Sequence, residues 1–251
     1  MPTLCSVFRL LSSVLCLLVV SVQAQPSAPT PPKLRFLFLD ESAGNYSLGL
    51  GPTHHRLATN PYEISPPFTP ADFKMLDVYK TLPDPVTGVP KPVKIASVTP
   101  PDDTPSALVI ITPRPPASAD VAPVYQLELI DSNPSLFPAG SIRIINRSPV
   151  SMMAQFGDTR SIAAPGELKL VQPSTDSRHR VSFRISIQNP QASGGWELIQ
   201  ASITVIRANE RMSGILVYSP GGMKHMLTAA ELAELGPPKP GCFWLTFSDT
   251  P

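Results

Sequence analysis

The side chains best suited to binding a metal ion lie together in one tetrad, Met223-Lys224-His225-Met226. Thioether and imidazole groups are ligands that suit Cu(I). Methionines beside a glycine pair and before a helix more commonly fill gaps among apolar side chains, and we favour that interpretation. The sequence therefore predicts no metal and no other cofactor.

The other three histidines offer little for catalysis. His54 and His55 are adjacent, so in an extended segment they would point to opposite faces, and their neighbours indicate a solvated loop. His179 lies between two arginines, in a sequence typical of a basic turn at the start of a strand. No nucleophile elbow, zinc-binding helix, phosphate loop or dinucleotide fingerprint occurs. We expect a protein that is not an enzyme, and the alternative is a secreted hydrolase whose site is assembled from distant loops.

The arginines of the second half are the best candidates for binding. Arg180 and Arg184 stand on the polar side of a strictly alternating segment, so they should share the outward face of one strand, with Arg143 close to them. Such a face would suit an anionic polysaccharide or the acidic surface of an envelope protein. A solvated sheet face, or one that pairs with an acidic first half, is the simpler interpretation.

The N-terminus has the pattern of a secretory signal peptide over residues 1–24. A short apolar segment from Leu10 to Val20 precedes Val22-Gln23-Ala24, where small residues stand at the positions that a signal peptidase reads. The apolar segment is shorter than the ~20 residues that span a bilayer, so we expect no membrane span after cleavage. These features predict a secreted or periplasmic protein.

Cleavage would leave 227 of the 251 residues, with 19 basic and 19 acidic side chains. A net charge of zero argues against binding to nucleic acid or to an anionic membrane. Cys242 would then be the one remaining cysteine, and its apolar neighbours predict a buried structural thiol rather than a nucleophile.

Proline is abundant, with 32 residues in all, and it disfavours long helices because it lacks a backbone N–H. Of these, 22 fall between Gln25 and Ala139, where they separate short apolar segments of strand length. Between Gly140 and Pro220 there are five prolines, and alternation becomes regular, as in Arg180–Gln188. The sequence thus predicts an all-β protein of two immunoglobulin-like antiparallel β-sandwich units.

The expected organisation has five parts. They are a signal peptide (1–24), a proline-rich tether (25–33), a first sandwich (34–131), a second sandwich (140–220) and a tail (221–251). In the tail, Thr228 and Glu231 form a capping-box pattern that predicts one short helix over 228–235.

The strand sequence Ser141–Ser148, followed by Met152–Phe156 and Ile203–Ile206, resembles small secreted bacterial β-sandwich modules. Among these, residues 140–220 are similar to the periplasmic accessory proteins of alginate O-acetylation. The resemblance implies a non-catalytic protein that binds a partner or a polysaccharide in an export assembly, and it identifies no functional residue. Together these features favour an exported, non-catalytic binding or assembly module of the bacterial envelope.

Overall fold

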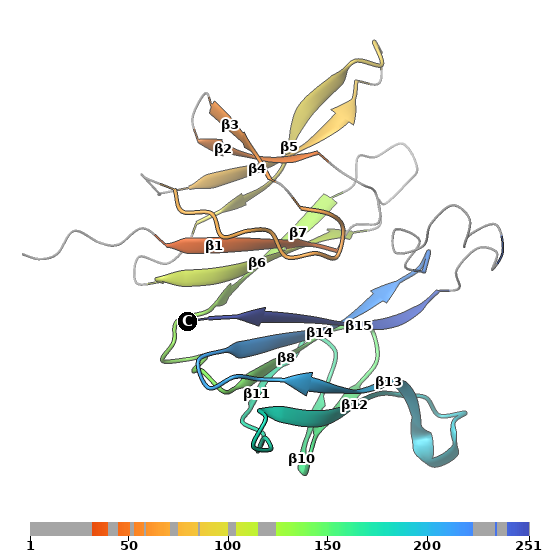
Figure 1. The fold of residues 1–251 in the computed structure, drawn as a ribbon. Helices are drawn as coiled ribbons and strands as arrows, with labels where there is room; N and C mark the ends of the chain where they lie inside the picture. The colour runs from red at the N-terminus through yellow and green to blue at the C-terminus, as the bar shows by residue number, and fades with distance from the viewer. Residues whose placement is uncertain are drawn as a thin grey trace, which may run out of the picture. The chain divides into compact units, whose positions relative to one another are not determined.

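The computed structural model describes residues 32–39, 45–50, 53–57, 59–70, 75–84, 86–99, 104–114, 124–222, 234 and 240–250. Strands and the turns between them make up nearly all of these residues, which confirms the all-β class (Figure 1). The expected leader, the Met223–Met226 tetrad and, apart from Glu234, the expected helix over 228–235 lie outside the described residues. Within the described residues, no helix has the length and apolar character needed to cross a membrane.

Two sheets built from the first half pack face to face. Sheet A has the order β1-β6-β7, with strands β1 (Lys33–Phe38), β6 (Ser106–Arg114) and β7 (Val124–Asp131). Sheet B has the order β3-β2-β4-β5, with strands β2 (Tyr46–Leu50), β3 (Thr53–Arg56), β4 (Leu76–Pro83) and β5 (Pro90–Val98). Their facing side chains form one apolar core, in which the stacked rings of Phe38 and Tyr46 are fully buried.

Two further sheets form the second sandwich. Sheet C has the order β11-β8-β14-β15, with strands β8 (Ile142–Arg147), β11 (Leu168–Val171), β14 (Arg211–Ser219) and β15 (Gly241–Asp249). Sheet D has the order β10-β9-β12-β13, with strands β9 (Met152–Phe156), β10 (Thr159–Ala163), β12 (Arg180–Gln188) and β13 (Trp196–Val205). A single 3-10 turn, η2 (Ser193–Gly195), joins β12 to β13. The core between the sheets includes Phe156, Phe183 and Trp244.

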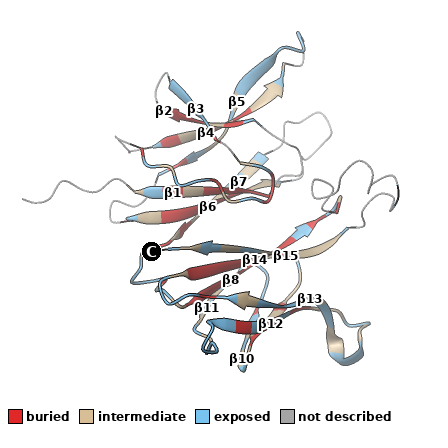
Figure 2. Cartoon of the chain, in the orientation of Figure 1, coloured by how far each residue is buried: buried red, intermediate tan, exposed pale blue. Residues whose placement is uncertain are grey.

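A third apolar cluster joins sheet A to sheet C. On β1, Phe36 packs into the core with sheet B, whereas Leu37 packs toward sheet C. On β14, Leu216 packs into the core with sheet D, whereas Ile215 packs toward sheet A. Burial on both faces explains why these strands are continuously apolar rather than alternating, and Figure 2 shows the buried residues concentrated along β6, β8 and β14.

The structure corrects the expected sandwiches in two respects. The pairs β1–β6 and β8–β14 are parallel, so sheets A and C are mixed rather than antiparallel. Alternation reports which face of a strand is buried and not the direction of its neighbour, so the sequence pattern could not reveal this. The strands β3 and β10 were also not expected, and β15 brings the C-terminal tail into sheet C. The immunoglobulin-like strand arrangement stays a prediction.

Candidate functional site

Sheet D turns one side of its strands to the core and the other to solvent. On β12, Val181, Phe183 and Ile185 lie in the core, and the alternate residues Arg180 and Arg184 are exposed. Residues that stand directly opposite in an antiparallel pair share a side, so the register extends this assignment to all four strands. The resulting outer face comprises Met153, Gln155, Arg160, Ile162, Arg180, Ser182, Arg184, Ser186, Gln188, Trp196, Leu198, Ala201, Ile203 and Val205, of which Ser186 is buried.

Several large apolar side chains are exposed on the outer face. Ile203 is 64% exposed, Leu198 57%, Ile162 50% and Val205 42%. Ile162 and Leu198 belong to one row that crosses the sheet, because Ile162 pairs with Met153 and the register continues through β12. Single exposed apolar residues are common, but contiguous ones mark interaction sites.

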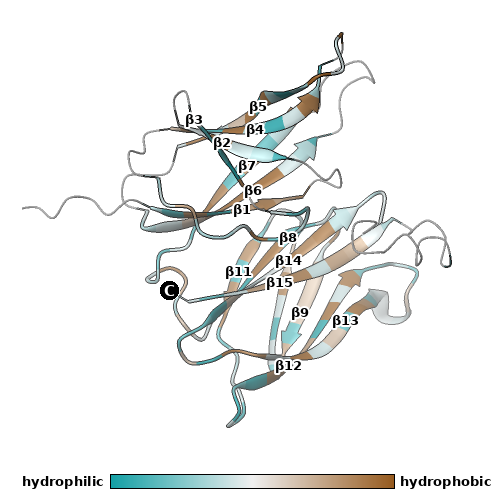
Figure 3. Cartoon of the chain, turned by 45° about the horizontal axis from the view of Figure 1, so that its top comes forward, coloured by the Kyte–Doolittle hydropathy of each residue, from teal (hydrophilic) through white to brown (hydrophobic). Residues whose placement is uncertain are grey.

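Three of these apolar residues, Leu198, Ile203 and Val205, belong to the edge strand β13, and the pattern of this strand explains their exposure. Its core side carries Gln200, Ser202 and Thr204, which stand opposite the core residues of β12. Its outer side carries the apolar residues, so the usual alternation of a strand on a core is inverted. Figure 3 shows hydrophobic and hydrophilic segments alternating along β12 and β13. This inversion places a hydrophobic surface where a free, solvated sheet would place polar side chains.

Positive charge is interleaved with these apolar residues. Arg160 and Arg184 lie in the same row, because Gln155 pairs with both of them. Neither arginine forms an ion pair with any part of the chain that the structure describes, whereas Arg180 pairs with Asp176 at 2.8 Å. The outer face therefore carries two cations whose charge a partner could neutralise.

The structure separates Arg143 from the arginines of β12, which corrects the expectation that it lies near them. Arg143 is on β8 of sheet C, and it is 4% exposed. Its guanidinium donates hydrogen bonds to the Ser213 hydroxyl, the Ser132 hydroxyl and the backbone carbonyl of Asp131. The strand's second face is covered by sheet A, so this arginine cannot contribute to a solvated sheet face.

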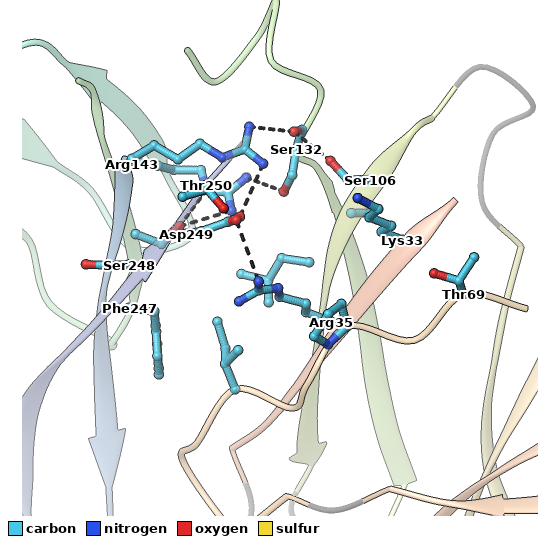
Figure 4. Close-up of a pocket in the computed structure, with 16 residues that line it drawn as sticks. Lys33, Arg35, Thr69, Ser106, Ser132, Arg143, Phe247, Ser248, Asp249 and Thr250 are labelled. Atoms are coloured by element: carbon cyan, nitrogen blue, oxygen red, sulfur yellow. Dashed lines mark hydrogen bonds and ion pairs between the residues drawn. The ribbon is translucent and has the colours of Figure 1, made fainter. Parts of the chain in front are cut away.

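Arg143 instead lines a cavity between sheets A and C. The cavity has a volume of about 320 Å³, and its lining includes Lys33, Arg35, Arg143, Arg211 and Asp249 (Figure 4). Asp249 stands directly opposite Arg211 in the β14–β15 pair and accepts a hydrogen bond from it at 3.2 Å. Asp249 also forms an ion pair with Arg35 at 3.7 Å. One carboxylate thus forms ion pairs with two arginines.

The two arginines at the floor of the cavity are strongly desolvated. The pKa of Arg143 is lowered to about 10, mainly by burial and then by the neighbouring charge of Arg211, against the opposing effects of Asp249 and Asp131. Both guanidinium groups lie over the ring of Phe137, at 4.3 Å and 4.7 Å from its centre. Two buried like charges therefore share one aromatic ring, and of the two Arg211 alone pairs with a carboxylate in the described residues, that of Asp249.

Of these cavity residues, the sequence singled out only Arg143 as a candidate for binding, and it gave no such indication for Lys33, Arg35, Arg211 or Asp249. The sequence did contain a pattern that indicates a buried position for Arg143. The apolar residues Ile142, Ile144 and Ile145 occupy both faces of β8. A strand that is apolar on both faces is covered on both, which excludes a solvated position for Arg143.

The described histidines do not assemble a common site. His54 and His55 are exposed residues of strand β3, which corrects the expected loop, and they do point to opposite sides, where they contact Tyr79 and Phe68. His179 lies at a turn in the other sandwich, with a positive φ of 58°. His225 lies outside the described residues, and within them no three metal-ligating side chains gather.

Cys242 is a free thiol and is half-buried. Its setting beside the core of the second sandwich raises the pKa of the thiol, mainly through burial. A raised pKa disfavours the thiolate, which is the nucleophilic form. The arrangement suits a structural thiol.

No protein-family model matches this chain, and no curated protein sequence matches it either.

Proposed function

We propose that this protein is an exported, non-catalytic binding or assembly module of the bacterial envelope, and that it binds a protein partner through the outer face of sheet D. Export is inferred from the signal-peptide pattern of residues 1–24. The binding role rests on one observation. One face of sheet D combines exposed aliphatic side chains with arginines that have no ion-pair partner among the described residues.

The composition of the outer face favours a protein over other partners. The centres of protein interfaces are more apolar than the rest of the surface, are enriched in arginine, methionine and aromatic residues, and are depleted of lysine and acidic side chains. The outer face has Arg160 and Arg184 beside Leu198 and Ile203. A complementary partner would present apolar side chains together with carboxylates, which would pair with these arginines.

An anionic polysaccharide is the second candidate partner, and Trp196 is the residue that favours it. Trp196 stands two residues before Leu198 on β13, so it shares the side of the outer face and lies at the end of that strand. An indole on the same face as the arginines would stack on a sugar ring, and the guanidinium of Arg184, two rows away in the register, would bind a carboxylate. A secreted hydrolase with a site assembled from distant loops remains the alternative function.

The test is affinity capture from an envelope extract of the source organism with four matched proteins. They are the wild type, Leu198→Ser/Ile203→Ser, Arg160→Gln/Arg184→Gln, and a control, Val86→Ser/Val89→Ser. The control removes two apolar side chains that are 91% and 61% exposed in the β4–β5 turn of the other sandwich.

We expect one protein to be enriched by the wild type and the control, and its recovery to fall about tenfold or more in both outer-face variants, as for centrally placed interface residues. Equal recovery by all four proteins would overturn the proposal. Enrichment of a glycan instead, with loss in Arg160→Gln/Arg184→Gln, would replace the protein partner with a polysaccharide.

A further inference from the structure

The facing sides of sheets A and C change from apolar to charged along their length. At one end, Leu37, Ile145 and Ile215 pack together in a common cluster. Two residues along the same faces, β1 carries Arg35 and β8 carries Arg143. The cavity of about 320 Å³ lies at this charged end, and its volume is at the lower end of the range for small-ligand sites, roughly 300 Å³ and above.

Cations outnumber anions in the lining of the cavity. Lys33, Arg35, Arg143 and Arg211 face a single carboxylate, that of Asp249. Asp249 is shared between Arg35 and Arg211, while Arg143 donates only to hydroxyls and to a backbone carbonyl. No ion-pair partner for Lys33 is found in the described part of the chain. The lining thus keeps an excess of positive charge inside a partly enclosed space.

A buried donor at the floor of the cavity is unused. Arg211 is 2% exposed, and two of its nitrogens donate to the carbonyls of Ser132 and Phe137 and to Asp249. Its Nε has no hydrogen-bond partner among the residues that the structure describes. A buried donor without a partner is unfavourable, so a ligand oxygen or a water that reached it would be stabilised.

From these observations we propose that the charged end of the A–C cavity binds a small organic oxyanion, a carboxylate or a phosphate ester that also carries hydroxyl groups. Lys33 and Arg35 stand at the exposed mouth and attract the anion, while Arg143 and Arg211 hold its oxygens at the floor. Hydroxyl-bearing residues around the cavity would accommodate hydroxyl groups of the ligand. These residues include Thr69, Ser106, Ser248 and Thr250. This site lies on other sheets than the outer face and does not depend on it.

The experiment is isothermal titration of the full chain, carrying a neutral C-terminal tag, with four probes. Inorganic phosphate, glucose 6-phosphate and citrate are the anionic probes, and glucose is the neutral one. The variant Lys33→Gln/Arg35→Gln removes the two cations of the mouth, and Thr250→Asp adds an acid beside them. The variant Lys91→Gln/Lys94→Gln removes two exposed cations of β5 and is the control for net charge.

We expect at least one anionic probe to bind with one-to-one stoichiometry, and glucose to give no saturable heat. Loss of both mouth cations should weaken this binding about tenfold or more, since hydrogen bonds to charged groups are the stronger ones and both would be lost. Thr250→Asp should weaken it in the same direction, and the control should match the wild type. Lys33 and Thr250 are exposed and Arg35 is partly exposed, so the variants should remain folded, which circular dichroism would verify.

Binding of glucose 6-phosphate and phosphate without citrate would assign a phosphate ester, and citrate alone would assign a carboxylate. The inference would be overturned by three outcomes: no saturable binding of any anion to the wild type, unchanged binding in both mouth variants, or an equal loss in the control. Leu198→Ser/Ile203→Ser should bind the probes normally, so failure of the outer-face proposal would not affect this result.

Discussion

The carboxylate of Asp249 is the single negative charge in the lining of a cavity with four cations, and its removal should measurably destabilise the fold. The perturbation is Asp249→Asn, which keeps the size and shape of the side chain. The Arg211 side chain is 3% exposed, so its charge would lose its nearest counter-ion while remaining out of water. Arg35 would lose the same partner at the mouth of the cavity.

The size of the effect follows from the burial of the two partners. Breaking a fully buried ion pair costs about 3–5 kcal/mol, because it leaves an uncompensated charge. Asp249 is 22% exposed and Arg211 keeps two carbonyl acceptors, so we expect a loss of about 2 kcal/mol in the free energy of unfolding. For a protein of this size that corresponds to a fall in Tm of about 4–8 °C.

Urea denaturation monitored by far-UV circular dichroism would measure this loss, provided that the slope of the transition is unchanged. The matched control is Glu167→Gln, which removes a charge from the exposed pair with Lys169 and should leave the midpoint unchanged. The difference should persist in high salt, since buried charges are screened much less than exposed ones. An Asp249→Asn protein as stable as the wild type would refute the account of the cavity as an under-neutralised cluster.

Three further predictions concern the core, acid stability and the thiol. A Cβ at Gly214 would overlap the indole of Trp244, so Gly214→Ala should lose about 1–3 kcal/mol in urea denaturation and Gly214→Ala/Trp244→Leu should recover part of it; wild-type stability of the single variant would contradict this packing. The hydrogen bond from Lys91 and those from two backbone N–H groups lower the pKa of Asp84 from 3.8 to about 2. Because the folded-state pKa is below the unfolded value, the ionised Asp84 stabilises the fold above pH 4, and this stabilisation is lost as the pH falls through 2. Between pH 5 and pH 2 the urea midpoint should therefore fall more in the wild type than in Asp84→Asn. Parallel pH curves of the two proteins would show that Asp84 does not contribute to stability. Burial raises the pKa of the Cys242 thiol, so a disulfide reagent at pH 8 should modify it at least about tenfold more slowly in the native protein than in urea, and equal rates would show that the thiol is accessible.

The sequence was sufficient to predict the all-β class and the solvent side of β12. Strict alternation over Arg180–Gln188 assigns Arg180 and Arg184 to one face, and the structure places both on the outer face of sheet D. Alternation carries this information because the side-chain period of a strand is two, so each apolar residue fixes the side of its polar neighbours.

The sequence could not predict which sheets would cover each other. Arg143, like Arg184, alternates with apolar residues along its strand. Its side of β8 faces sheet A, however, and that depends on contacts between residues far apart in the chain. Asp249 and Arg211 lie 38 residues apart in the chain, near the end of β15 and at the start of β14. Their pairing arises from the antiparallel register of β14 and β15, which no local pattern encodes.

The sequence also could not predict that the apolar residues of β13 are exposed. Segment Trp196–Val205 has the alternation of an ordinary amphipathic strand, and the simplest assumption turns Ile203 and Val205 toward the core. The register with β12 turns them outward instead, because Ile203 stands opposite Ser182 and Val205 opposite Arg180. A single strand cannot reveal which of its two faces is buried when it lies at the edge of a sheet.

The most direct test of the central claim, that the outer face of sheet D contacts a protein partner, is site-specific photo-crosslinking in the source organism. A photoreactive amino acid would replace Ala201, which is exposed in the row of Arg160 and Arg184, and in a second strain Val86, in the other sandwich. We expect a discrete protein adduct from position 201 and none from position 86. Illumination that yields no adduct at position 201, or the same adducts from both positions, would contradict it.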